Sequence, residues 1–176
     1  RPDRHASSLV EDGTGKPVRL HIRGASFYNL QSMEAMVPGS MVADAVAIID
    51  GMSGAETTYR QLIGQINLFA GALASRGIGV GSVVGVLCPN VPAFATVFHG
   101  ILRAGATATT INSLYTPDEI ANQLTDAGAE WLITVSPLLP GALAAAEKLG
   151  MPADHLIVLD GAEGHPSLPS LLAEGH

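Results

Sequence analysis

Polar residues that could contact a ligand follow two strand-like runs of this 176-residue chain. The apolar run Val83–Cys88 is followed by Asn90, and the run Ala106–Thr110 is followed by Asn112. Ligands of open α/β sheets bind outside the carboxyl ends of the strands, so Asn90, Thr110 and Asn112 are candidates to line a cleft. The same residues also suit local roles, Asn90 as a helix cap and the other two as turn formers. Both interpretations stay open.

Two further side chains belong to types that often do chemistry, His99 and Cys88. His99 lies in a helix-like run beside Phe98 and other apolar residues, which favours a packing role. Cys88 ends an apolar strand and is interpreted as a packed thiol. No Ser or Asp partner for His99 is identifiable, so no catalytic triad is indicated. We therefore assign no catalytic, cofactor-binding or metal-binding residue from the sequence.

The glycine-rich stretch Gly77-Ile78-Gly79-Val80-Gly81 resembles a nucleotide-binding loop in composition. A dinucleotide loop follows a strand and opens a helix, so that the helix N-terminus meets phosphate. Here the glycines follow a helix-like run and lead into a strand, which predicts a tight turn between helix and strand.

The elements that position these residues alternate regularly from residue 45 to residue 160. Two helix starts are marked by capping boxes, Thr58 with Gln61 and Thr116 with Glu119. Continuous apolar runs predict buried strands at Ala45–Asp50, Val83–Cys88, Ala106–Thr110, Trp131–Val135 and Leu156–Asp160. Helices are predicted after Thr58 and Thr116 and over Pro92–Ala104 and Pro137–Leu149. The pattern predicts an α/β fold, a mostly parallel sheet with helices on both faces.

The first forty residues differ in pattern from the rest. Val18, Leu20 and Ile22 alternate with polar residues, which is typical of a half-exposed strand, but helical periodicity is weak. We expect residues 1–40 to form an irregular leader with one strand, and residues 41–176 to form the α/β domain.

Composition limits the classes of function. The net charge of −7 argues against nucleic-acid binding, which depends on Lys and Arg. No apolar run is long enough to span a membrane. The single cysteine, Cys88, is typical of a protein from a reducing compartment, so we expect a cytoplasmic location. The apolar fraction of 47% also fits an exposed apolar face, through which a homodimer could form.

Six segments follow one another along the chain: Thr58–Leu62, Arg76–Gly81, Val83–Asn90, Gly100–Ala106, Thr109–Leu114 and Thr116–Ile120. This ordered set resembles the opening of adenylate-forming (AMP-binding) acyl- and aryl-CoA ligases, and most closely the 4-coumarate–CoA ligase-like branch. The resemblance covers about residues 45–160. Ser82 and Ser113 depart from the family pattern, where Asp and Pro are frequent, but both are turn sites.

The resemblance implies a two-step reaction. A carboxylate attacks ATP to give an acyl-adenylate and pyrophosphate, and the thiol of CoA then displaces AMP. ATP, CoA and Mg²⁺ serve the complete enzyme. The family's Ser/Thr/Gly-rich phosphate loop ending in Pro-Lys-Gly has no counterpart here, and neither Lys16 nor Lys148 stands beside a glycine loop. We expect an N-terminal subdomain truncated before that loop, inactive alone and with no cofactor bound.

Two alternatives come from the residues themselves. One is a stand-alone, doubly wound domain that binds a nucleotide or flavin at the strand-end loops near Asn90 and Asn112. The other is a non-catalytic interaction module that associates through an exposed apolar face.

Overall fold

The computed structural model describes residues 8–11, 17–21 and 41–175. The chain divides into two units, residues 1–44 and residues 45–176. In the first unit, β1 (Ser8–Glu11) pairs antiparallel with β2 (Pro17–His21), and a 3-10 helix, η1, spans Met41–Asp44. Most of the expected leader, including Ile22, lies outside the described residues.

The second unit is built on a parallel sheet of four strands in the order β6-β5-β7-β8. Both β5–β6 and β5–β7 pair without a register shift. The chain starts in the middle of this sheet at β5, adds β6 on one side, and then crosses to the other side for β7 and β8. This confirms the predicted parallel α/β fold. The strands are β5 (Val83–Leu87), β6 (Thr107–Ile111), β7 (Trp131–Thr134) and β8 (Leu156–Val158).

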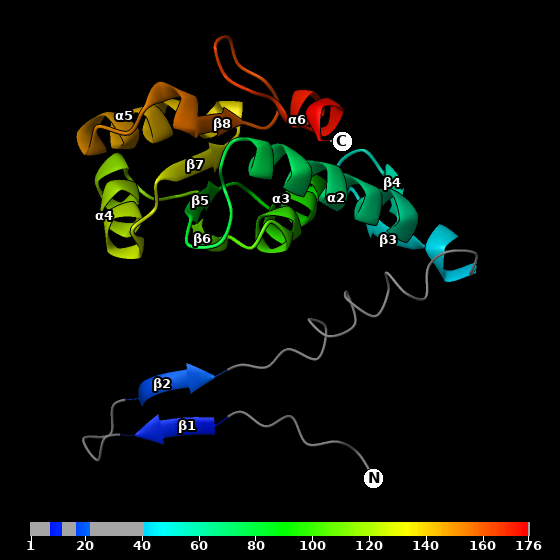
Figure 1. The fold of residues 1–176 in the computed structure, drawn as a ribbon, viewed down its shortest axis with the longest axis horizontal. Coiled ribbons are helices and arrows are strands. Elements are labelled where there is room, and N and C mark those ends of the chain that lie inside the picture. The colour runs from blue at the N-terminus through cyan, green and yellow to red at the C-terminus, as the bar shows by residue number, and fades with distance from the viewer. Residues whose placement is uncertain (1–7, 12–16, 22–40, 176) are drawn as a thin grey trace. The chain divides into compact units, whose positions relative to one another are not determined.

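Helices cover both faces of this sheet, as predicted (Figure 1). One face packs against α2 (Tyr59–Ser75), α3 (Pro92–Arg103) and α6 (Leu168–Glu174). The other face packs against α4 (Pro117–Ala127) and α5 (Leu139–Leu149). Successive strand residues point to opposite faces, so each strand contributes to both cores.

The predicted strand over Ala45–Asp50 exists but does not belong to the parallel sheet. It is β3 (Val46–Ile49), which pairs antiparallel with β4 (Glu56–Thr58) in a separate two-stranded hairpin. The sequence prediction therefore placed β3 in the wrong sheet and did not include β4. A short apolar run is equally compatible with either sheet, since its partner is chosen by contacts distant in sequence.

Both predicted capping boxes are present. The backbone N–H of Gln61 donates to Thr58 Oγ1 (3.3 Å), and Thr58 N donates to Gln61 Oε1 (2.8 Å). Thr116 N donates to Glu119 Oε2 at 2.8 Å in the same manner. Each box satisfies N–H groups that a helix start otherwise leaves unpaired.

Other local expectations hold less well. The helix expected from Pro137 begins as a 3-10 turn, η2 (Ser136–Leu138), before α5. A second 3-10 turn, η3 (Ala153–His155), precedes β8. Helix α6 was not predicted, because its seven residues are too few to show a clear apolar period.

Candidate functional site at the carboxyl edge of the sheet

The loops that follow β5 and β6 meet at the carboxyl edge of the sheet and form an open pocket of about 640 Å³. The structure thus brings together Asn90, Thr110 and Asn112, the three residues that the sequence singled out. Ser113, Tyr115 and Gln123, which the sequence did not indicate, join them. The complete lining is Cys88, Pro89, Asn90, Phe94, Thr110, Ile111, Asn112, Ser113, Tyr115 and Gln123.

This pocket is polar but uncharged, since no Lys, Arg, His, Asp or Glu is among its lining residues. Within the described part of the chain, the side chains of Asn90, Thr110, Ser113 and Tyr115 have no protein hydrogen-bond partner. Asn112 differs, because its Oδ1 accepts from Leu114 N (3.0 Å) and so shapes the turn as well. The edge therefore presents neutral donors and acceptors beside the apolar Phe94 and Ile111.

Asn90 does not cap the next helix, contrary to one of its two interpretations. The residue before α3 is Val91, and no side chain caps the helix. Pro92 at the helix start lacks an N–H, and Phe94 N already donates to Val91 O (2.9 Å). The start of α3 thus offers few free donors to an anion.

The start of η2 and α5, after β7, already has an anion beside it. Ser136 N donates to Asp160 Oδ1 (2.7 Å), and Ser136 Oγ donates to Gly161 O (3.0 Å). Asp160 follows β8, so its carboxylate joins two neighbouring strand ends. A second anion, such as a phosphate, would be repelled by this carboxylate. No local sequence pattern indicates this contact, because its partners are distant along the chain.

Cys88 lines the pocket and is buried. Burial, and then the negative charge of Asp160, raise the pKa of its thiol to about 11. The thiol is therefore neutral near pH 7 and is a poor nucleophile. This agrees with its interpretation as a packed thiol.

His99 lies outside the lining of this pocket. Its imidazole is half-buried and meets the ring of Phe98 edge-on at a centroid distance of 5.5 Å. Burial lowers the pKa of the imidazole. The packing interpretation from the sequence fits this environment.

A second, smaller pocket of about 280 Å³ lies beside the first, between the β3–β4 hairpin and the start of α3. We call the two pockets together the carboxyl-edge groove. Asn90 and Phe94 line both pockets. Exposed apolar side chains also occur on the flanking elements, with Ile49 and Met52 on the hairpin and Leu114 after β6. The hairpin's contribution could not be predicted from sequence, because β3 was assigned to the parallel sheet.

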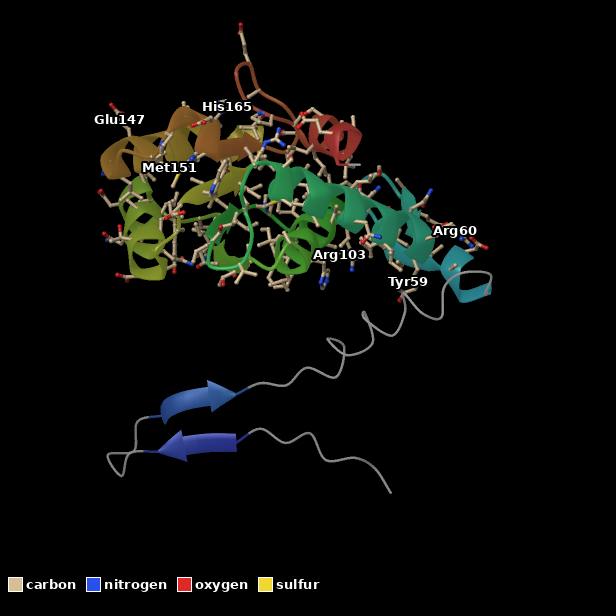
Figure 2. All side chains as sticks on the ribbon, in the orientation of Figure 1. Tyr59, Arg60, Arg103, Glu147, Met151 and His165 are labelled. Atoms are coloured by element: carbon tan, nitrogen blue, oxygen red, sulfur yellow. The ribbon has the colours of Figure 1, made fainter. Side chains whose placement is uncertain are left out.

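The glycine-rich stretch lies at the opposite edge of the sheet, between α2 and β5. Gly77 and Gly81 adopt positive φ angles of 77° and 94°, which glycine accepts without strain. The stretch is a helix-to-strand turn, as predicted. Arg103 also lies toward that edge, since it ends α3 just before β6, and Figure 2 shows its side chain directed away from the sheet.

The described residues include neither a metal-binding cluster nor a membrane-spanning helix. No group of three or more His, Cys, Asp or Glu side chains is arranged to hold a metal ion in that part of the chain. None of its helices is both long and apolar enough to cross a bilayer.

Comparison with family models decides the family. The AMP-binding enzyme model matches residues 39–171, more than half of the chain. The chain belongs to the AMP-binding enzyme family. A second model, for the 49 kDa subunit of respiratory-chain NADH dehydrogenase, matches only residues 4–55. The AMP-binding match therefore contains the entire parallel sheet, whereas the second match reaches no further than the β3–β4 hairpin.

The AMP-binding chain is similar to curated CoA ligases. It is 36% identical over 115 residues to 4-coumarate–CoA ligase 3 of Oryza sativa subsp. japonica, covering 65% of this chain and 20% of the relative. It is 38% identical over 96 residues to a long-chain-fatty-acid–CoA ligase of Salmonella typhimurium, covering 53% and 17%. The chain thus spans about a fifth of the length of the curated relatives that it matches.

Solved structures of CoA ligases are also similar to this chain. A benzoate CoA ligase from Burkholderia xenovorans LB400 superposes with a TM-score of 0.71 at 25% identity, covering 85% of this chain and 28% of the other. An anthranilate CoA ligase in complex with anthranoyl-AMP gives 0.72 at 29% identity, covering 82% and 27%. The AMP-binding fold is therefore shared across most of the chain.

Proposed function

We propose that this chain is the N-terminal part of an ATP-dependent carboxylate–CoA ligase of the 4-coumarate or fatty-acid type. The observation that carries the proposal is the AMP-binding match over residues 39–171, together with relatives that are CoA ligases. In the complete enzyme, a carboxylate would attack ATP to form an acyl-adenylate, and CoA would then form the thioester. ATP, CoA and Mg²⁺ would be its cosubstrates and cofactor.

The carboxyl-edge groove would form one wall of the substrate cleft and would contact uncharged parts of the substrates. Its lining is neutral, α3 starts with Pro92, and the start of η2 is occupied by Asp160. Phosphates and an adenylating transition state need cations and fixed donors. We propose that these groups come from polypeptide outside the present chain, so that residues 1–176 alone are inactive.

Two assays test this function. The 176-residue chain, mixed with ATP, Mg²⁺, CoA and a panel of aryl and fatty acids, is expected to release no pyrophosphate, and robust release would contradict its inactivity. The gene beyond the codon for His176 is expected to encode a Ser/Thr/Gly-rich loop ending in Pro-Lys-Gly. The complete product should then release pyrophosphate with at least one of the acids. A complete product that lacks both the loop and the activity would refute the proposal.

A second candidate function is a stand-alone nucleotide- or flavin-binding domain. The strand order β6-β5-β7-β8 favours it, because doubly wound flavin-binding folds share that order. Titration calorimetry with ATP, AMP, FMN and NAD separates the two functions. Tight binding of any of these to the 176-residue chain would favour the stand-alone domain, and no binding is expected for the ligase fragment.

We also propose that the chain self-associates as a homodimer. The exposed apolar side chains, which include Val80 at 93% exposure and Leu114 at 88%, support this proposal. Light scattering over a concentration series tests it, and a constant monomer mass would refute it. A cytoplasmic location, as expected from the lone cysteine, remains a prediction.

A further inference from the structure

The two edges of the parallel sheet differ in how they are covered. At the β8 edge, Val158 N donates to Pro166 O (3.1 Å) and Leu168 N donates to Leu159 O (2.9 Å), so the returning chain occupies that side. At the other edge, β6 pairs with β5 alone. Within the described ranges, no strand covers the outer side of β6.

The backbone of β6 shows which groups this outer side presents. Thr107 N donates to Ser82 O (2.9 Å), which is the side of β5. Alternate residues of a strand face opposite sides, so the N–H and C=O groups of Ala108 and Thr110 face outward. The carbonyl of Thr110 accepts from Gln123 Nε2 at 2.7 Å, which agrees with this orientation. Ala108 is the outward residue of β6 with both groups unpaired among the described residues.

Strand β6 lacks the charge, the proline and the bulge that commonly prevent edge pairing. Its sequence, Thr-Ala-Thr-Thr-Ile, has no charge and no proline, and its register with β5 contains no bulge. Natural edge strands are commonly protected by Lys, Pro or a bulge. Three threonines and an isoleucine also favour extended backbone.

Exposed apolar side chains lie near both ends of this strand. At the amino end, Val80 lies beside Gly105, where its Cγ2 would be 2.9 Å from an added Cβ, and Val80 is 93% exposed. Leu114, 88% exposed, follows the carboxyl end. In an antiparallel pair of identical strands, the amino end of one meets the carboxyl end of the other. Such a pair would therefore bring Val80 of each copy toward Leu114 of its partner.

We propose that two copies of this chain associate by antiparallel pairing of their β6 edges about a two-fold axis at Ala108. Ala108 would exchange two N–H···O=C hydrogen bonds with the same residue of the second copy, and the contact between Gln123 and Thr110 would stay intact. This inference rests on the proposed self-association and names its interface. A dimer held by two backbone hydrogen bonds and two apolar contacts should be weak and concentration-dependent.

The test is sedimentation equilibrium of the 176-residue chain over a concentration series, with three changes at the edge. Ala108→Pro removes an outward N–H without touching the β5 pairing, and should abolish the dimer while circular dichroism stays native. V80K and L114E should each weaken the dimer by on the order of tenfold. The double variant V80K/L114E should restore it, because each introduced ammonium would face a carboxylate of the partner. Met52→Lys, at an exposed position of the hairpin, is the matched control and should leave the dimer unchanged.

The possible outcomes distinguish the proposal that β6 forms the interface from the proposal that the chain self-associates at all. A dimer that survives Ala108→Pro, or that is lost with Met52→Lys, refutes pairing through β6 but keeps self-association. A monomer at every concentration refutes both self-association and pairing through β6. In that case the β6 edge would be free to pair with a strand from polypeptide outside the present chain. Neither result bears on the CoA-ligase assay, which measures pyrophosphate from the complete product.

Discussion

Gly100 of α3 lies directly against the ring of Phe69 of α2. A Cβ added to Gly100 would come within 2.5 Å of Phe69 Cδ1 and 3.4 Å of its Cβ. Phe69 is fully buried, so its ring has little freedom to move away. The absence of a side chain at Gly100 therefore allows the close packing of α2 on α3.

Gly100→Ala should destabilise the protein, by roughly 1–3 kcal/mol for an overpacked core. Gly64→Ala is the matched control, because Gly64 lies inside α2 with no atom within 4 Å of an added Cβ. That control should stabilise the protein by up to about 1 kcal/mol through helix propensity. Urea unfolding, followed by the fluorescence of the single tryptophan, Trp131, measures both. Equal effects of the two substitutions would contradict the packing argument.

A second contact between the same helices is polar. Thr96 Oγ1 donates to Gln65 Oε1 at 2.9 Å, and Thr96 is 1% exposed. Gln65→Leu should cost roughly 1–3 kcal/mol, because it leaves a buried hydroxyl without a partner. The double variant Gln65→Leu/Thr96→Val should recover most of this loss. A double-mutant cycle with no coupling between the two positions would show that the bond contributes nothing.

The raised pKa of Cys88 predicts slow alkylation. A shift from 9.0 to about 11 reduces the thiolate fraction at pH 8 by roughly a hundredfold, and burial slows access further. Reaction of the native chain with iodoacetamide should therefore be at least that much slower than reaction of the chain unfolded in guanidinium. Asp160→Asn should speed the native reaction slightly, because it removes the second cause of the shift. Equal rates in the native and unfolded chains would show that the thiol is not protected.

The capping box of α4 should make stability depend on pH. Hydrogen bonds from the backbone N–H and then the hydroxyl of Thr116 lower the pKa of Glu119 below its ordinary value of 4.5. Because the folded-state pKa is the lower one, this contribution is complete above about pH 4.5 and is lost as the pH falls through the folded-state value. Glu119→Gln keeps the geometry of the box and should reduce the loss of stability in acid. Urea unfolding at several pH values measures it, and equal pH slopes for the two proteins would contradict the prediction.

Local features of the fold were predictable from sequence, and non-local ones were not. The capping boxes at Thr58 and Thr116 were found because their hydrogen bonds span three residues. The partner of β3 was assigned wrongly, since an apolar strand does not specify its neighbour. At the site, Asn90, Thr110 and Asn112 were predicted to line one cleft, because ligands of open α/β sheets bind outside the carboxyl ends of the strands. The contact between Asp160 and Ser136 was missed, because it joins residues 24 positions apart.

Thr58 has two structural roles at once, as the last residue of β4 and the N-cap of α2. It pairs with Val46 across the hairpin, and the next residue, Tyr59, donates its N–H to Ala45 O at 3.1 Å. No linker separates the β3–β4 hairpin from α2, so we expect the two to move as one rigid body. A spin label at Met52, on the hairpin turn, would then report tilting of the 17-residue helix α2.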